Sequence, residues 1–75
     1  MKDLLTFLIK EITGIEDFTV TEEKVDDKVN LTVSVPQESV GLIIGKEGKT
    51  IKNIRKILAI KATQENTVVS INVNP

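Results

Sequence analysis

Apolar residues follow two clear spacings along the 75-residue chain, and each spacing predicts a different element. From Lys2 to Thr13 they repeat at i, i+3, i+4 and i+7, which is the period of one helix face. The residues on this face are Leu5, Leu8, Ile9 and Ile12. Residues 28–35 instead alternate strictly between apolar and polar, with Val29, Leu31, Val33 and Val35 on one side. The first segment is predicted to be a helix that ends at Gly14, and the second a half-buried strand.

Two weaker patterns complete the set of strands. Residues 18–25 alternate less strictly but are rich in Thr and Val, and residues 67–73 carry a similar composition. Asp26 and Asp27 separate the first two strands, as expected of a hairpin turn, and Pro36 marks the end of the second. The sequence therefore predicts three strands in all.

A pair of glycines separates two further predicted helices. Residues 40–44 form a short apolar segment, Gly45 and Gly48 follow it, and a longer helix is predicted over residues 49–62. The apolar face of that helix consists of Ile51, Ile54, Leu58 and Ala62. The order α-β-β-α-α-β predicts an α+β two-layer sandwich, in which three helices cover a three-stranded sheet, with residues 1–75 as one domain.

Composition excludes several classes of function. The chain has no cysteine and no histidine, which removes disulfides and the usual nucleophiles and zinc ligands. Its carboxylates and lysines show no convergent spacing, so we expect no catalysis and no cofactor. No segment reaches the roughly 18 apolar residues that span a bilayer, and a cytoplasmic protein is expected. A loose cation site near Glu22, Glu23 and the Asp26-Asp27 turn stays open as an alternative to a plain turn.

Charge is strongly segregated although the net charge is only −1. Residues 1–39 sum to −5, whereas residues 40–62 sum to +5 with Glu47 as their one acidic side chain. A local positive surface of this kind attracts polyanions at contact range. The segment around the two glycines is therefore the candidate for nucleic-acid contact.

The glycine loop itself has the chemistry of a phosphate-binding turn. Without side chains, Gly45 and Gly48 allow a sharp turn and let a phosphodiester chain approach the backbone closely. The N–H groups at the start of the following helix, together with its dipole, favour an anion. The alternative is that the two glycines only form a tight turn between helices.

At this loop the chain resembles the KH family. Its signature Ile-Ile-Gly-x-x-Gly-x-x-Ile occurs at residues 43–51, and the order of elements is similar to the type II arrangement. Over its whole length the chain is most similar to the stand-alone bacterial KH proteins of the KhpA type. The resemblance implies non-catalytic binding of short single-stranded RNA, with single-stranded DNA as a possible substitute, in a small RNA-chaperone-like protein.

The resemblance also implies which residues bind. The loop residues Gly45, Lys46, Glu47 and Gly48 are expected to hold phosphates of about four nucleotides, with the charge of Lys49 added at the helix start. The residues expected to line the groove for the bases are Ile43, Ile44 and Ile51. Arg55, further along the helix, is expected to reach phosphate or a base edge, and Lys52 is expected to contact the RNA as well. Val69 or Ile71 would form the opposite wall.

Two features predict weak binding. Glu47 sets a carboxylate beside the expected phosphate path, and the chain has two Phe but no Tyr or Trp. Both Phe7 and Phe18 lie in elements expected to be core. Stacking on aromatic side chains, worth about 1–3 kcal/mol per base, is therefore not expected.

Other interpretations stay open for the same residues. The three isoleucines are typical of an ordinary core, and Lys52, Lys56 and Lys61 are typical of a solvated helix face. The whole chain could also be a protein-interaction module for which RNA is incidental. The KhpA-type resemblance implies a homodimer, or a heterodimer with a larger KH-containing protein, and pairing two sites raises affinity without new contacts.

Overall fold

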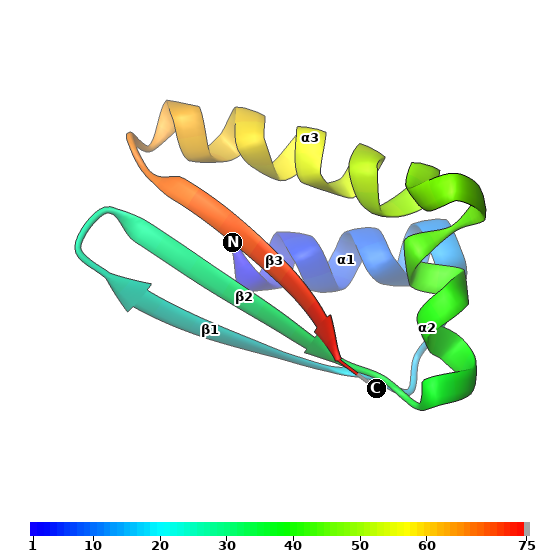
Figure 1. The fold of residues 1–75 in the computed structure, drawn as a ribbon. Coiled ribbons are helices and arrows are strands. Elements are labelled where there is room, and N and C mark those ends of the chain that lie inside the picture. The colour runs from blue at the N-terminus through cyan, green and yellow to red at the C-terminus, as the bar shows by residue number, and fades with distance from the viewer. Residues whose placement is uncertain (75) are drawn as a thin grey trace.

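Three α-helices cover one face of a three-stranded sheet in the computed structural model, which describes residues 1–74 (Figure 1). The elements in chain order are α1 (Lys2–Thr13), β1 (Thr19–Val25), β2 (Lys28–Ser34), α2 (Gln37–Ile44), α3 (Lys49–Gln64) and β3 (Val68–Asn74). A short 3-10 turn, Lys46–Gly48, joins α2 to α3. The predicted α+β architecture and the order α-β-β-α-α-β are confirmed.

The sheet has β2 in its centre and β3 at one edge. The strand order is β1-β2-β3, with β1 antiparallel and β3 parallel to β2. The turn between β1 and β2 contains Asp26 in the left-handed region at φ 54, which Asp tolerates better than most residues. The parallel pair is possible because α2 and α3 lie between β2 and β3 in the sequence and carry the chain back across the helical face.

The alternating pattern of β2 supplies the centre of the core. Val29, Leu31, Val33 and Val35 are all buried, as the alternation predicts. The helices contribute the facing layer through Leu5, Ile9, Ile43, Ile54 and Leu58, which are fully buried. β1 buries only Val20, so its weak alternation reflects an edge strand with most of its side chains in solvent.

One residue on the predicted face of α1 does not reach the core. Leu5, Leu8 and Ile9 are buried, but Ile12 is exposed and lies outside the core cluster. It sits in the last turn of the helix, just before Gly14 ends α1 in the left-handed conformation at φ 74. Neighbouring elements therefore cover the apolar stripe for only part of its length.

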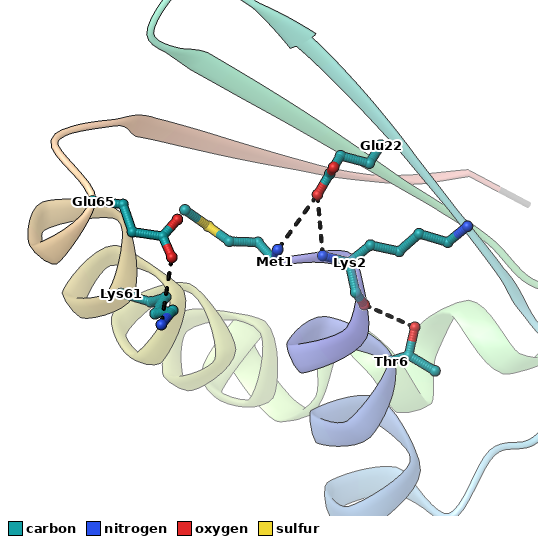
Figure 2. A network of polar contacts seen from close by, with 6 residues as sticks. All are labelled: Met1, Lys2, Thr6, Glu22, Lys61 and Glu65. Carbon is teal, nitrogen blue, oxygen red and sulfur yellow. Dashed lines mark hydrogen bonds and ion pairs between the residues drawn. The ribbon is translucent and has the colours of Figure 1, made fainter.

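A carboxylate from β1 anchors the start of α1. The backbone N–H of Lys2 donates to Oε1 of Glu22 over 3.2 Å, and the ammonium group of Met1 lies 3.5 Å from the same oxygen (Figure 2). The first N–H groups of a helix lack partners within the helix, so an acidic acceptor there stabilises it. A second ion pair, Lys61 to Glu65 at 3.4 Å, lies at the far end of α3 (Figure 2).

Two findings bear on function classes. Within residues 1–74, no group of three His, Cys, Asp or Glu side chains is arranged to hold a metal ion, and this includes the region of the Asp26-Asp27 turn. No helix of the described part of the chain has the length and the apolar run that crossing a membrane requires.

Candidate nucleic-acid interface

The loop between α2 and α3 is held in shape by its own backbone. The N–H of Gly45 donates to the carbonyl of Gly41 over 2.8 Å and so closes α2. The N–H of Gly48 donates to the carbonyl of Gly45 over 3.1 Å, which forms the 3-10 turn. The loop is therefore a defined turn between two helices and not an extended linker.

Three positive φ angles, at Gly45, Glu47 and Gly48, shape this turn. Gly45 has φ 78 and ψ 174, a region open to glycine alone, and Gly48 has φ 75 and ψ 13. Glu47 also adopts a left-handed conformation, at φ 56 and ψ 26. A residue with a side chain adopts this conformation at a cost of about 1–2 kcal/mol. The exposed Glu47 therefore lies in the loop with a strained backbone conformation.

Two amide groups of the loop have no backbone partner. The N–H groups of Lys46 and Glu47 precede Gly48, the first hydrogen-bonded donor of the turn, and no backbone acceptor is found for either within residues 1–74. Both residues are exposed. Both N–H groups lie in the turn just before Gly48, the N-cap of α3, where an anion gains hydrogen bonds close to the positive end of the helix dipole.

Basic side chains continue from this loop along α3. Lys46, Lys49, Lys52 and Arg55 are exposed, and Arg55 lies seven residues beyond Gly48, or about 10 Å along the helix. Lys61 lies further along and is paired with Glu65. The positive charge available to a ligand is thus concentrated on the first half of α3, next to the loop.

The three isoleucines expected to line a groove separate into two groups. Ile43 is fully buried and Ile51 is buried, so both pack in the core and offer almost no surface to a ligand. Ile44 is 37% exposed. Leu42, which the sequence analysis did not single out, is 59% exposed and lies two residues before it on α2. The exposed apolar side chains of α2 near the loop are therefore Leu42 and Ile44, which lie about 200° apart around the helix axis and so do not share one face.

A hollow of about 370 Å³ lies between α3 and the edge strand β3. It is lined by Arg55, Val69, Ser70, Ile71 and Asn72. The sequence left open whether Val69 or Ile71 would form the wall, and both line the hollow. Its size is near the lower end of the range for small-molecule sites, about 300–1,000 Å³, which suits one or two bases better than a large ligand.

The free edge of β3 adds hydrogen-bonding groups to this hollow. The N–H of Val68 donates to Asp27 over 2.8 Å, and the carbonyl of Asn74 accepts from Val35 over 3.1 Å, so both residues direct their backbone toward β2. Successive residues of a strand point their backbone groups in opposite directions. Val69 and Ile71 therefore direct their N–H and C=O groups away from β2, toward the open edge.

Ser70 and Asn72 were missed by the sequence analysis, and their positions show why. Both are exposed polar residues in a strand, which is an ordinary pattern for a solvated sheet face. Only the strand order, which leaves β3 at the edge beside α3, brings them to the hollow. The one available signal was their place between Val69, Ile71 and Val73 in the strand.

Comparisons with known proteins agree over nearly the whole chain. A family model described as "KhpA/KhpB, KH domain" matches residues 2–73. The "RNA-binding protein KhpA" of Chlamydia caviae is 35% identical over 74 residues, which cover 97% of this chain and 95% of that protein. The protein of the same name from Clostridium perfringens is 31% identical and covered over 99% of its length. That of Bacillus subtilis is 28% identical, with 91% covered. No solved structure matches the chain significantly.

Proposed function

Because the chain belongs to the KhpA/KhpB KH-domain family, whose members are non-catalytic RNA-binding domains, we propose that it holds a short single strand of RNA against residues 45–48. Phosphates bind to the loop and to the first half of α3, and bases enter the hollow beside β3. The relatives are bacterial proteins named for RNA binding.

The observation that carries the proposal is the pair of unpartnered N–H groups on Lys46 and Glu47. They lie in the turn just before α3, between the exposed basic side chains of Lys46 and Lys49, where an anion gains hydrogen bonds, opposite charge and the field of the helix dipole. An anionic chain rather than a single anion is favoured because the basic residues continue to Lys52 and Arg55. The partly exposed Ile44, the last residue of α2 before the loop, would support a base on the α2 side.

Base contact is proposed at the edge of β3. Val69 and Ile71 offer backbone donors and acceptors there, and Arg55 lies across the hollow from them. Single-stranded RNA is recognised through such unstacked bases and their edges. Affinity is expected to be weak, because no aromatic residue lines the hollow and Glu47 stands at the loop tip.

The test replaces the loop charge without touching the core. The double variant Lys46→Asp with Glu47→Asp keeps both exposed positions polar, and Asp tolerates the left-handed conformation at residue 47. Its matched control is Lys10→Asp with Glu11→Asp, the same pair of residues exposed on α1. Fluorescence titration with a randomised short RNA should show at least tenfold weaker binding for the loop variant only. Equal binding by both variants would refute the loop as the site.

A second candidate, a protein-docking role, is favoured by one observation. Ile57 and Ile60 on α3 are exposed, and so is Phe7 on α1, which the sequence had placed in an element expected to be core. The two isoleucines are three residues apart and so share one helix face. We propose that Ile57 and Ile60 of α3, together with Phe7 of α1, form a contact surface, named here the α1/α3 face. Through this surface the chain forms a homodimer, or a heterodimer with a larger KH-containing protein. Such pairing would place two RNA sites in one particle.

Both proposals fit one cellular role. A protein that binds single strands weakly and in pairs can hold RNA open and release it again, as an RNA-chaperone-like protein does in the cytoplasm. A protein that only docks to a partner would bind its partner at any salt concentration and show no salt-dependent RNA titration. Repeating the titration at two salt concentrations, and with single-stranded DNA of the same sequence, separates these outcomes.

A further inference from the structure

We propose that Asn72 reads adenine at one position of the bound strand. The proposal rests on the proposed function, because it needs a base in the hollow beside β3. It assigns base preference to a side chain that lies outside the glycine loop and its helix. Val69 and Ile71 provide the backbone contacts, and Asn72 provides the discrimination between bases.

The hollow extends around the edge of the sheet. Val69 and Ile71 point their side chains toward the helices, whereas Ser70 and Asn72 point theirs to the open face of the sheet. All four residues nevertheless line the same hollow with Arg55. The hollow therefore includes the free edge of β3 and reaches Asn72, the residue next to Ile71, which puts Asn72 beside a base that meets this edge.

The side chain of Asn72 is available for a ligand. It is exposed, and no hydrogen bond to another residue engages its amide within residues 1–74. The backbone N–H and C=O of Asn72 point toward β2, because Asn72 lies an even number of residues from Val68 and Asn74, whose backbone groups bond on that side. A change at this side chain therefore leaves the sheet hydrogen bonds in place.

Backbone groups alone discriminate poorly among bases. The N–H and C=O of Ile71 form a neighbouring donor and acceptor, and each of the four bases has an edge that can meet such a pair. A further group must make the difference. An Asn amide has one acceptor and two donors, and its preferred partner is adenine, through N6 and N7. Adenine can use N1 and one N6 hydrogen on Ile71, and N7 with the other N6 hydrogen on Asn72.

The experiment measures the binding of four fluorescent tetranucleotides, rA4, rC4, rG4 and rU4, to the full chain and to two variants. The variants are Asn72→Ala and Asn74→Ala, and the second is the control because Asn74 lies on the same strand and face but outside the hollow. Circular dichroism and urea unfolding check that both variants keep the fold. The readout is the ratio of each dissociation constant to that of rA4.

The unchanged chain should bind rA4 most tightly. Asn72→Ala should reduce that preference by about three- to tenfold, the usual value of one net hydrogen bond, while Asn74→Ala leaves it unchanged. Binding without base preference, an unchanged ratio in Asn72→Ala, or an equal loss for all four RNAs would each overturn the proposal. A failure of the unchanged chain to bind any RNA would instead refute the proposed function.

Discussion

Gly45 lies directly against Thr50, the second residue of α3. A Cβ atom added at Gly45 would lie 2.6 Å from Cβ of Thr50 and 2.8 Å from its backbone nitrogen. Real Cβ contacts are essentially never that short, and a backbone atom cannot move aside as a flexible side chain can. A Cβ at Gly48, in contrast, would meet nothing within 4 Å. The two glycines of the loop are therefore needed for different reasons.

Gly45→Ala should destabilise the protein more than Gly48→Ala does. The first change adds a clash with Thr50 to an unfavourable backbone conformation, and we expect a loss of about 2–4 kcal/mol. The second adds only left-handed strain, about 1–2 kcal/mol. Urea unfolding of both variants measures the difference. Equal losses would show that the loop moves away from α3 easily and that the close packing of Gly45 on Thr50 does not contribute to stability.

Glu47→Gly should raise both stability and RNA affinity. Glycine adopts the left-handed conformation of residue 47 without strain, which is expected to stabilise the fold by about 0.5–1 kcal/mol. Removal of the carboxylate beside the phosphate path should tighten RNA binding several-fold. Glu65→Gly at the far end of α3 is the control for loss of one negative charge. If both variants tighten binding equally, net charge and not loop position decides affinity.

Lys52 and Lys61 test which lysines of α3 contact phosphate. Lys52→Gln should lower the slope of log affinity against log salt by about 0.7, the value of one single-strand phosphate contact. Lys61→Gln should leave the slope unchanged, because Lys61 pairs with Glu65 and lies nine residues further along the helix. RNA titrations at four salt concentrations give both slopes. An unchanged slope for Lys52→Gln would assign that residue to the solvated face.

Ile60→Gln tests the α1/α3 face. Ile60 is 62% exposed, so a polar replacement should not reduce stability, but it removes the centre of the proposed contact between two copies. Sedimentation equilibrium should show a monomer, and affinity for a long RNA with two sites should fall at least about tenfold. Affinity for a tetranucleotide should not change.

The control for this variant is Val68→Thr, at a similarly exposed apolar residue on β3. It should leave the association of the protein unchanged. If Ile60→Gln and the unchanged chain sediment alike, a second copy does not cover this face, and the exposed isoleucines need another partner or none.

Periodicity was sufficient to predict the fold where one face of an element is buried. The alternation of β2 and the apolar face of α3 predicted every buried residue of those two elements. Periodicity failed at Ile12, because the spacing of apolar residues predicts which face of α1 is apolar but not how far along the helix other elements cover that face. The loop was found from its glycines, since few residues other than glycine adopt its dihedral angles.

The rest of the candidate interface depends on tertiary placement. The run Ile43-Ile44 looks uniform in sequence, but one residue is fully buried and its neighbour is partly exposed, because adjacent helical positions are rotated by about 100°. The hollow beside β3 depends on which strand lies at the sheet edge, and a parallel pair between β2 and β3 leaves no local signal. Ser70 and Asn72 could not be found without that pairing.

The parallel pairing of β2 with β3 also sets when the interface can exist during synthesis. Lys28 pairs with Val68, forty positions later, and every other element precedes β3 in the chain. Contacts this distant in sequence form late and slowly. On the ribosome, the helices and the glycine loop therefore emerge before the wall of the hollow. A nascent chain can attract RNA by charge, but it gains the edge proposed to meet the bases only after β3 has been synthesised.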